Sequence, residues 1–401
     1  MNSPVSSAQN SFRPYLNAIG SAHTSEGIRQ VVFPWLVVGV LGLSADKLGL
    51  AQMVMMLPNL LLLLWGGAIS DNRHLGSYLF RLYLLYSVPF IVLIGWSLLF
   101  GFSFVLIIVF GLSFGLITPF VQPAKESLLA QVTAQAVQGA IAKTTFVQFS
   151  ANSVGILIAS LMEQVGLYAL LVAQVVMYVA AAYFFRNCHS ETNVLAKKTT
   201  TLRDVVSGVQ LVWGNTQLRQ LMSLVAITSF VGLAVYLVAI AFLARDVYQG
   251  GASFFAVLQF CFMAGVVVAN GLFIRFHHLL KRLGRALLLC YVFRAVLLLL
   301  ISLRFSAEWA AALVFIWGCF YGLSTTLARS LAFSEAPSEY RSRVVSIFQL
   351  CLFGAAPFGA FAAGLLVESL GVLVAIKILS GVILLTALVG VFKGPLWNFR
   401  H

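Results

Sequence analysis

The sequence predicts an all-α polytopic membrane protein in which twelve transmembrane helices form two pseudo-symmetric six-helix bundles. Of its 401 residues, 61% are hydrophobic and only 9% are charged, whereas soluble domains carry about 25% charged residues. The mean hydropathy is +0.97. The apolar stretches are continuous and about 20 residues long, which is the length that a helix needs to cross about 30 Å of hydrocarbon. These observations exclude a soluble enzyme.

The apolar spans fall into two groups of six, separated by one longer polar interval. This interval contains a polar run and then apolar residues at helical spacing, which indicates a cytoplasmic linker with an amphipathic helix on the membrane surface. We expect an N-terminal six-helix bundle over 1–186, the linker over 187–219, and a C-terminal six-helix bundle over 220–401. The predicted spans lie near 17–43, 48–69, 77–98, 102–122, 144–162, 167–185, 220–243, 252–274, 285–303, 307–328, 344–367 and 371–392.

Two short similarities indicate that the halves are related. Residues 162–166, at the end of the fifth span, resemble residues 367–371 at the end of the eleventh, with an offset of 205. Gly67 near the end of the second span corresponds to Gly271 in the eighth, with an offset of 204. Parallel repeats with a central loop are typical of two-halved secondary transporters, whose substrate site lies between the halves.

The basic residues predict the orientation of the chain. The termini and the even-numbered loops hold nineteen Lys and Arg residues, and the odd-numbered loops hold three, Lys47, Arg245 and Arg304. Because cytoplasmic loops are rich in Lys and Arg, both termini are predicted to be cytoplasmic. The same bias accounts for most of the net charge of +13 without a nucleic acid as partner.

The loop after the second span carries a recognisable motif. It runs from Gly66 to Arg73 with the sequence Gly-Gly-Ala-Ile-Ser-Asp-Asn-Arg. This run resembles the G-x-x-x-D-R signature of the major facilitator superfamily, with Asn72 at the position where Arg is usual. The resemblance implies a major facilitator fold, in which Gly67 allows close helix approach while Asp71 and Arg73 form a latch between conformational states.

Further segments resemble one branch of that superfamily, the enterobactin-exporter and macrolide-efflux group. They are Ser25–Ile28, Pro123–Leu129 and Ala356–Ala360. The resemblance implies a monomer in a bacterial cytoplasmic membrane that exports a hydrophobic or amphiphilic small molecule. The Pro-Ala-Lys triplet at 123–125 is also similar to bacterial lysophospholipid transporters. We therefore expect export by alternating access as proton-coupled antiport, and transport of lysophospholipid or another lipid, including uniport, is the alternative.

Glu26 is the most informative single residue, because it lies about ten residues into the first span. His23 and Arg29 lie one helical turn to either side of it. A carboxylate at such a depth costs about 2.5–3.5 kcal/mol, so it should face a partner or a wet cavity. Two interpretations remain open: Glu26 takes up and releases the transported proton with Arg29 and His23 as neighbours, or it forms a structural pair with Arg29.

Other polar residues lie on spans that the resemblance places around a central cavity. A mostly apolar and aromatic lining with few polar groups suits an amphiphilic ligand, although such residues also join helices to one another. Arg294, about nine residues from either end of the ninth span, is a further intramembrane charge. The candidate cavity residues are Ser113, Gln122, Gln148, Asn152, Tyr236, Gln259, Trp317 and Tyr321.

One enzyme-like motif occurs in the sequence, a G-x-S-x-G match at Gly111–Gly115, and we interpret it as a small-residue patch of the fourth span because it lacks a strand-turn-helix context. There is no G-x-x-x-x-G-K-[ST] run for ATP and no H-E-x-x-H pair for zinc, so we expect no catalytic residues, metal or cofactor. The expected partners are protons, a small amphiphilic substrate and the lipid bilayer. A non-transporting sensor or scaffold is the alternative from another class, and it predicts a collapsed cavity.

Overall fold

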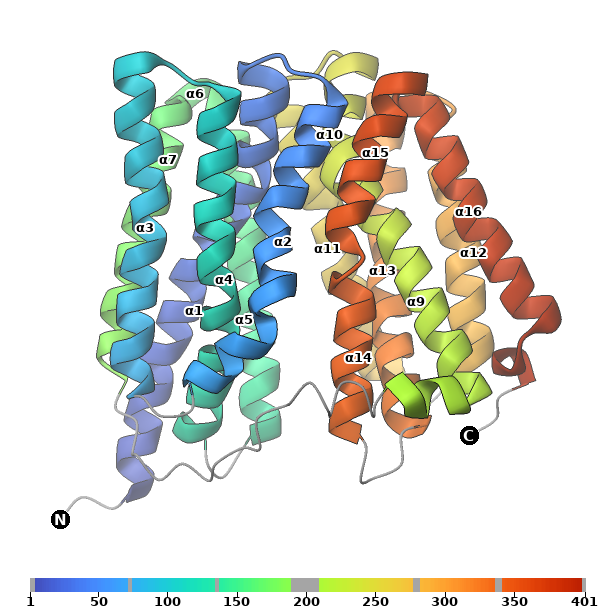
Figure 1. Cartoon of the computed structure of the whole chain (residues 1–401), viewed down its shortest axis with the longest axis horizontal. Helices are drawn as coiled ribbons and strands as arrows, with labels where there is room; N and C mark the ends of the chain where they lie inside the picture. The colour runs from blue at the N-terminus through green and yellow to red at the C-terminus, as the bar shows by residue number, and fades with distance from the viewer. Residues whose placement is uncertain are drawn as a thin grey trace. The chain divides into compact units, whose positions relative to one another are not determined.

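The computed structural model is largely helical and contains no strand in the ranges that it describes (Figure 1). The chain divides into two compact units. Unit 1 comprises Met1–Leu41 and Val54–Thr199, and unit 2 comprises Gly42–Met53 and Thr200–His401. The described residues are 4–70, 74–133, 137–188, 209–276, 282–335 and 341–398.

Unit 1 is built around two sets of helix contacts. Helix α1 packs against α5 and α7, and α3 packs against α7 and α4. Phe90, Phe110, Phe114 and Tyr178 interlock between α3, α4 and α7, with ring centroids 4.9–6.3 Å apart. The helices are α1 (Pro4–Trp35) with a π-helical end η1 (Leu36–Val40), α2 (Ala45–Ser70), α3 (Leu75–Phe100), α4 (Phe104–Val132), α5 (Val137–Ser160), the short α6 (Met162–Val165) and α7 (Leu167–Arg186).

The contact between α1 and α5 depends on a pair of glycines. A Cβ at Gly27 would collide with the backbone carbonyl of Asn152 and would lie 3.0 Å from the Cα of Gly155. Only residues without a side chain permit this approach, as in other small-residue interfaces of membrane helices. The crossing fixes the position of α1 and of the charged side chains on either side of Gly27.

Unit 2 has its strongest contacts between α11 and α13, with α12 packed against α13 and α16. The helical segment that begins with α9 ends in a π-helical turn, η3, just as α1 ends in the π-helical η1. The elements are α9 (Thr216–Ala234), η2 (Val235–Ala239), α10 (Ile240–Phe242), η3 (Leu243–Val247), α11 (Ala252–Phe276), α12 (Leu283–Ile301), α13 (Ala307–Glu335), α14 (Arg341–Phe353), α15 (Ala356–Leu370), α16 (Val372–Lys393) and the 3₁₀ turn η6 (Pro395–Asn398).

Helix α2 contributes to both units. Its beginning belongs to unit 2, where the backbone N–H of Ala45 donates to Oε2 of Glu368 at 3.0 Å. A Cβ at Gly364 would lie 2.5 Å from the carbonyl oxygen of Ala45, so α15 and α2 touch through their backbones. From Val54 onward α2 belongs to unit 1, and Pro58 inside the helix has no N–H to donate to the Val54 carbonyl.

Each of the twelve predicted spans is largely helical, with the span near 344–367 interrupted at Gly354 and Ala355 between α14 and α15, so the all-α polytopic fold is confirmed. Nine helical segments within the described residues are long and apolar enough to cross a membrane. Several helices run past the predicted spans: α4 continues to Val132 and α13 to Glu335. An apolar run indicates only the part of a helix that crosses the hydrocarbon. The helix itself can continue beyond that run into polar residues. The predicted linker remains a prediction, because 189–208 lie outside the described residues, while 209–214 are helical.

Candidate functional site

Glu26 and Arg29 form an ion pair on α1. The Arg29 Nε donates to Glu26 Oε2 at 3.0 Å, and Nη2 pairs with Oε1, so the carboxylate occupies one edge of the guanidinium. The helix brings the two side chains together because they are one turn apart. The Arg29 side chain is 12% exposed and that of Glu26 is 28% exposed, so the carboxylate is the accessible end of the pair.

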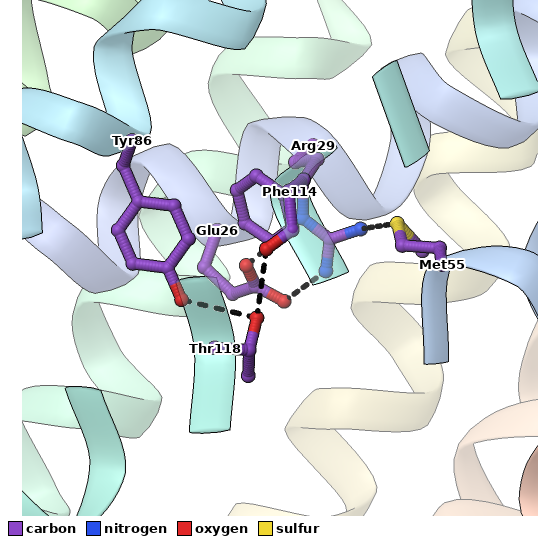
Figure 2. A network of polar contacts seen from close by, with 6 residues as sticks. All are labelled: Glu26, Arg29, Met55, Tyr86, Phe114 and Thr118. Carbon is purple, nitrogen blue, oxygen red and sulfur yellow. Dashed lines mark hydrogen bonds and ion pairs between the residues drawn. The ribbon is translucent and has the colours of Figure 1, made fainter. Parts of the chain in front are cut away.

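Two further helices hold the Arg29 guanidinium. Its Nη1 donates to the Met55 sulfur at 3.0 Å, and its Cζ lies 4.7 Å from the centre of the Phe114 ring (Figure 2). A sulfur atom and an aromatic face are weak partners for a cation, so the carboxylate provides most of the charge compensation. The arginine therefore joins α1, α2 and α4 within unit 1.

A short chain of hydroxyl groups lies beside this pair. The Tyr86 hydroxyl donates to the Thr118 hydroxyl at 3.1 Å, and Thr118 donates to the Phe114 carbonyl at 3.2 Å (Figure 2). Tyr86 comes from α3, so four helices of unit 1 contribute to the group around Glu26. The sequence prediction did not include Tyr86, Met55 or Phe114, because these contacts depend on how each helix is rotated.

Three other polar side chains lie in the interior of unit 1. The His23 Nε2 and the Asn152 Oδ1 are buried and have no hydrogen-bond partner within the part of the chain that the structure describes. Lys125 on α4 is 8% exposed and lies within electrostatic range of Glu26. Lys125 was not among the predicted site residues, although it belongs to the Pro-Ala-Lys triplet.

The remaining predicted cavity residues of unit 1 lie on α4 and α5. Ser113 lines a cavity of about 90 Å³ between α3 and α4, together with Val92 and Val109, which are about half exposed. Gln122 is exposed and donates to Glu126 at 3.0 Å, and Gln148 is half-buried on α5. Of the predicted latch, Gly67 lies in α2, and Asp71 and Arg73 lie outside the described residues.

Unit 2 collects the other predicted residues around one phenylalanine. The Phe262 ring on α11 lies 4.5 Å from Tyr236, 4.6 Å from Trp317 and 5.2 Å from Tyr321, measured between ring centres. Gln259 lies one turn before Phe262 and is 2% exposed, with a buried Oε1 that has no partner in the described chain. Phe262 was missed because one more aromatic residue in an apolar helix gives no sequence signal.

Arg294 lies beside this aromatic cluster. Its side chain on α12 is buried, and Nη1 donates to the Ser324 hydroxyl at 3.1 Å. The Cζ atom lies 4.7 Å from the Tyr321 ring centre and 5.4 Å from that of Tyr291. A Cβ at Gly232 on α9 would lie 2.5 Å from Nη2, so the guanidinium reaches the α9 backbone.

Comparison with protein families gives one match. The family model described as the Major Facilitator Superfamily matches residues 17–360. No curated protein matches the chain.

Solved structures of similar fold are transporters. The nucleoside transporter NupG superposes with a TM-score of 0.75 at 9% identity, covering 98% of this chain and 100% of its own. An inward-facing bacterial homologue of the iron transporter ferroportin gives 0.69 at 13% identity, covering 94% and 98%. The human organic anion transporter MFSD10 gives 0.68 at 13% identity, covering 96% and 99%. At these identities the likeness shows the fold alone.

Proposed function

The chain belongs to the major facilitator superfamily, and from that premise we propose that it exports a hydrophobic or amphiphilic small molecule by alternating access, driven by proton entry. It is a multi-pass membrane transporter and not an enzyme. The proposal includes a place in a bacterial cytoplasmic membrane with both termini cytoplasmic, on the basis of the basic residues in the even-numbered loops. It also includes membership of the enterobactin-exporter and macrolide-efflux group and the division of the chain into two six-helix bundles. Gly67, Asp71 and Arg73 form the conformational latch in this proposal.

The Glu26–Arg29 pair is the observation that supports proton coupling. A carboxylate on a membrane-spanning helix is costly unless it is paired or wetted, and Glu26 is both paired and partly exposed. Protonation of Glu26 would remove the negative charge, and the Met55 sulfur and the Phe114 ring that also contact Arg29 would not balance its charge. The two protonation states therefore differ strongly in the stability of this contact between α1, α2 and α4. Such a difference can couple a proton to a conformational change.

The experiment uses everted membrane vesicles with an acidic interior, to which drugs, siderophores and lysolipids are added one class at a time. Proton-coupled export predicts that the pH gradient falls when the substrate class is added. Glu26→Gln should abolish this fall while substrate-for-substrate exchange, which needs no proton, continues. Glu163→Gln changes an exposed carboxylate of the same unit and should behave like the unaltered protein.

Two results would overturn the proposal. The first is proton release that persists in Glu26→Gln. The second is substrate exchange without any effect on the pH gradient in the unaltered protein, which would favour uniport of a lipid. Continued exchange in Glu26→Gln also shows that the variant is folded, so loss of proton release cannot be attributed to misfolding.

A further inference from the structure

We propose that unit 2 contains a binding site for an organic anion, in which Arg294 receives the carboxylate or phosphate of an amphiphilic substrate. This inference rests on the proposed export function and names the chemical class of the molecule that is exported. The residues concerned lie on α9, α11, α12 and α13. They provide a buried guanidinium edge without an acceptor, no facing carboxylate among the described residues, and an aromatic cluster beside the charge.

Nε and Nη2 form one edge of the Arg294 guanidinium. Both nitrogen atoms are buried and have no hydrogen-bond acceptor among the described residues, while Nη1 is satisfied by Ser324. These two nitrogens are adjacent and present parallel N–H groups, which is the geometry that binds a carboxylate or a phosphate in a bidentate manner. Arg29 uses the same two nitrogens to hold Glu26. The corresponding position beside Arg294 is without a carboxylate.

The described groups around Arg294 do not balance its charge. The titratable groups that face it are Tyr291, Tyr321 and Cys290, none of which is acidic enough to balance a guanidinium at neutral pH. The structure therefore gives this cation aromatic faces and one hydroxyl, but no counter-ion in the described chain. The acidic residues described in unit 2 all lie at or near helix ends: Asp46, Asp246, Glu308, Glu335 and Glu368.

An aromatic surface lies beside the Arg294 guanidinium. Trp317, Tyr321 and Ser324 lie at positions i, i+4 and i+7 of α13, so they share the face that contacts Arg294. The Trp317 Nε1 is a second buried donor without an acceptor in the described residues. Phe262 extends this face with a further ring. A ligand that combines an anionic group with an apolar body matches both the guanidinium edge and the aromatic surface.

The test is equilibrium binding to the full chain in nanodiscs of zwitterionic lipid, measured by calorimetry. The probes are decanoate, decyl phosphate and the neutral decanol. Inorganic phosphate, which has no apolar chain, is the fourth probe. At least one of the two amphiphilic anions should bind about tenfold or more tighter than decanol, because a hydrogen bond to a charged group is among the strongest in proteins. Inorganic phosphate should bind more weakly than decyl phosphate.

Substitutions distinguish a specific role of the Arg294 guanidinium from a general effect of positive charge. Arg294→Gln should reduce the preference for the anion over decanol to less than about threefold, whereas Lys377→Gln, which removes an exposed cation on α16, should leave it unchanged. Trp317→Phe keeps a ring and removes the donor, so it should weaken anion binding several-fold and leave decanol binding unchanged. Decanol binding and thermal unfolding report whether each variant is folded.

The proposal is overturned if neither anion binds better than decanol, or if folded Arg294→Gln keeps the preference. If Arg294→Gln does not fold, Trp317→Phe decides in the same way: unchanged anion binding overturns the site. Because no pH gradient is used, failure here leaves proton-coupled export standing. Conversely, a failed vesicle experiment does not affect this titration.

Discussion

Each unit holds an arginine on a long helix, and the two arginines differ in what occupies the same edge of the guanidinium. In unit 1, Nε and Nη2 of Arg29 hold the Glu26 carboxylate. In unit 2, the same atoms of Arg294 have no acceptor in the described chain. Both Cζ atoms lie 4.7 Å from an aromatic ring centre, that of Phe114 or that of Tyr321. The two arginines thus share an aromatic neighbour and differ in their counter-ion.

The presence or absence of a counter-ion gives the two arginines different electrostatic properties. A cation with its own carboxylate is electrically neutral as a pair, and its state changes when a proton reaches the carboxylate. A cation without a carboxylate stays charged and attracts an anion from outside the protein. Unit 1 is therefore suited to carry a proton and unit 2 to recognise a substrate, which is the division of roles that we propose. Three sets of substitutions test this comparison.

Removal of the carboxylate should have the largest effect. Glu26→Gln leaves Arg29 buried without its counter-ion, and breaking a buried pair costs about 3–5 kcal/mol. Because Glu26 is partly exposed, we expect a loss of about 3 kcal/mol, seen as a lower midpoint of thermal unfolding in detergent. The double variant Glu26→Gln, Arg29→Gln should recover most of this loss. If the single and double variants unfold at the same temperature, the pair is not a source of stability.

Replacement of Arg294 should have a smaller effect, with the opposite sign. Arg294→Met removes a cation that has no counter-ion in the described chain, and exchange of buried charge for an apolar side chain is often neutral or stabilising by about 1–2 kcal/mol. The midpoint of thermal unfolding without ligand should therefore stay or rise. Arg29→Met serves as the matched variant and should lower it, because Glu26 is left alone. Equal losses in both would contradict the comparison.

Removal of one weak partner from each arginine should have the smallest effect. Ser324→Ala deprives Arg294 of a hydroxyl acceptor and should cost about 1 kcal/mol. Met55→Leu deprives Arg29 of a sulfur contact while the Glu26 carboxylate remains, and should cost about 0.5 kcal/mol. The measurement is again the unfolding midpoint in one detergent. A larger loss for Met55→Leu would mean that Arg29 depends on more than its carboxylate.

The sequence predicted the helices and one contact of the site. Continuous apolar runs determine where helices cross the membrane, and an i, i+3 spacing determines that Glu26 and Arg29 meet. The contacts of Arg29 with Met55 and of Arg294 with Ser324 join different helices, so they depend on the rotation of each helix. In a membrane protein the lipid-facing and buried sides are equally apolar, so the sequence pattern gives little information on that rotation.

Helix α2 has a mechanical consequence that follows from one proline. Pro58 leaves the Val54 carbonyl without its helical hydrogen bond, and Val54 is the first residue of α2 that belongs to unit 1. The helix is therefore least stiff at the boundary between its two attachments. A load applied to Ala45–Met53 would bend α2 there before it turned the rest of the helix as a rigid rod. We therefore expect α2 to act as a compliant element at this point, because one backbone N–H group is absent.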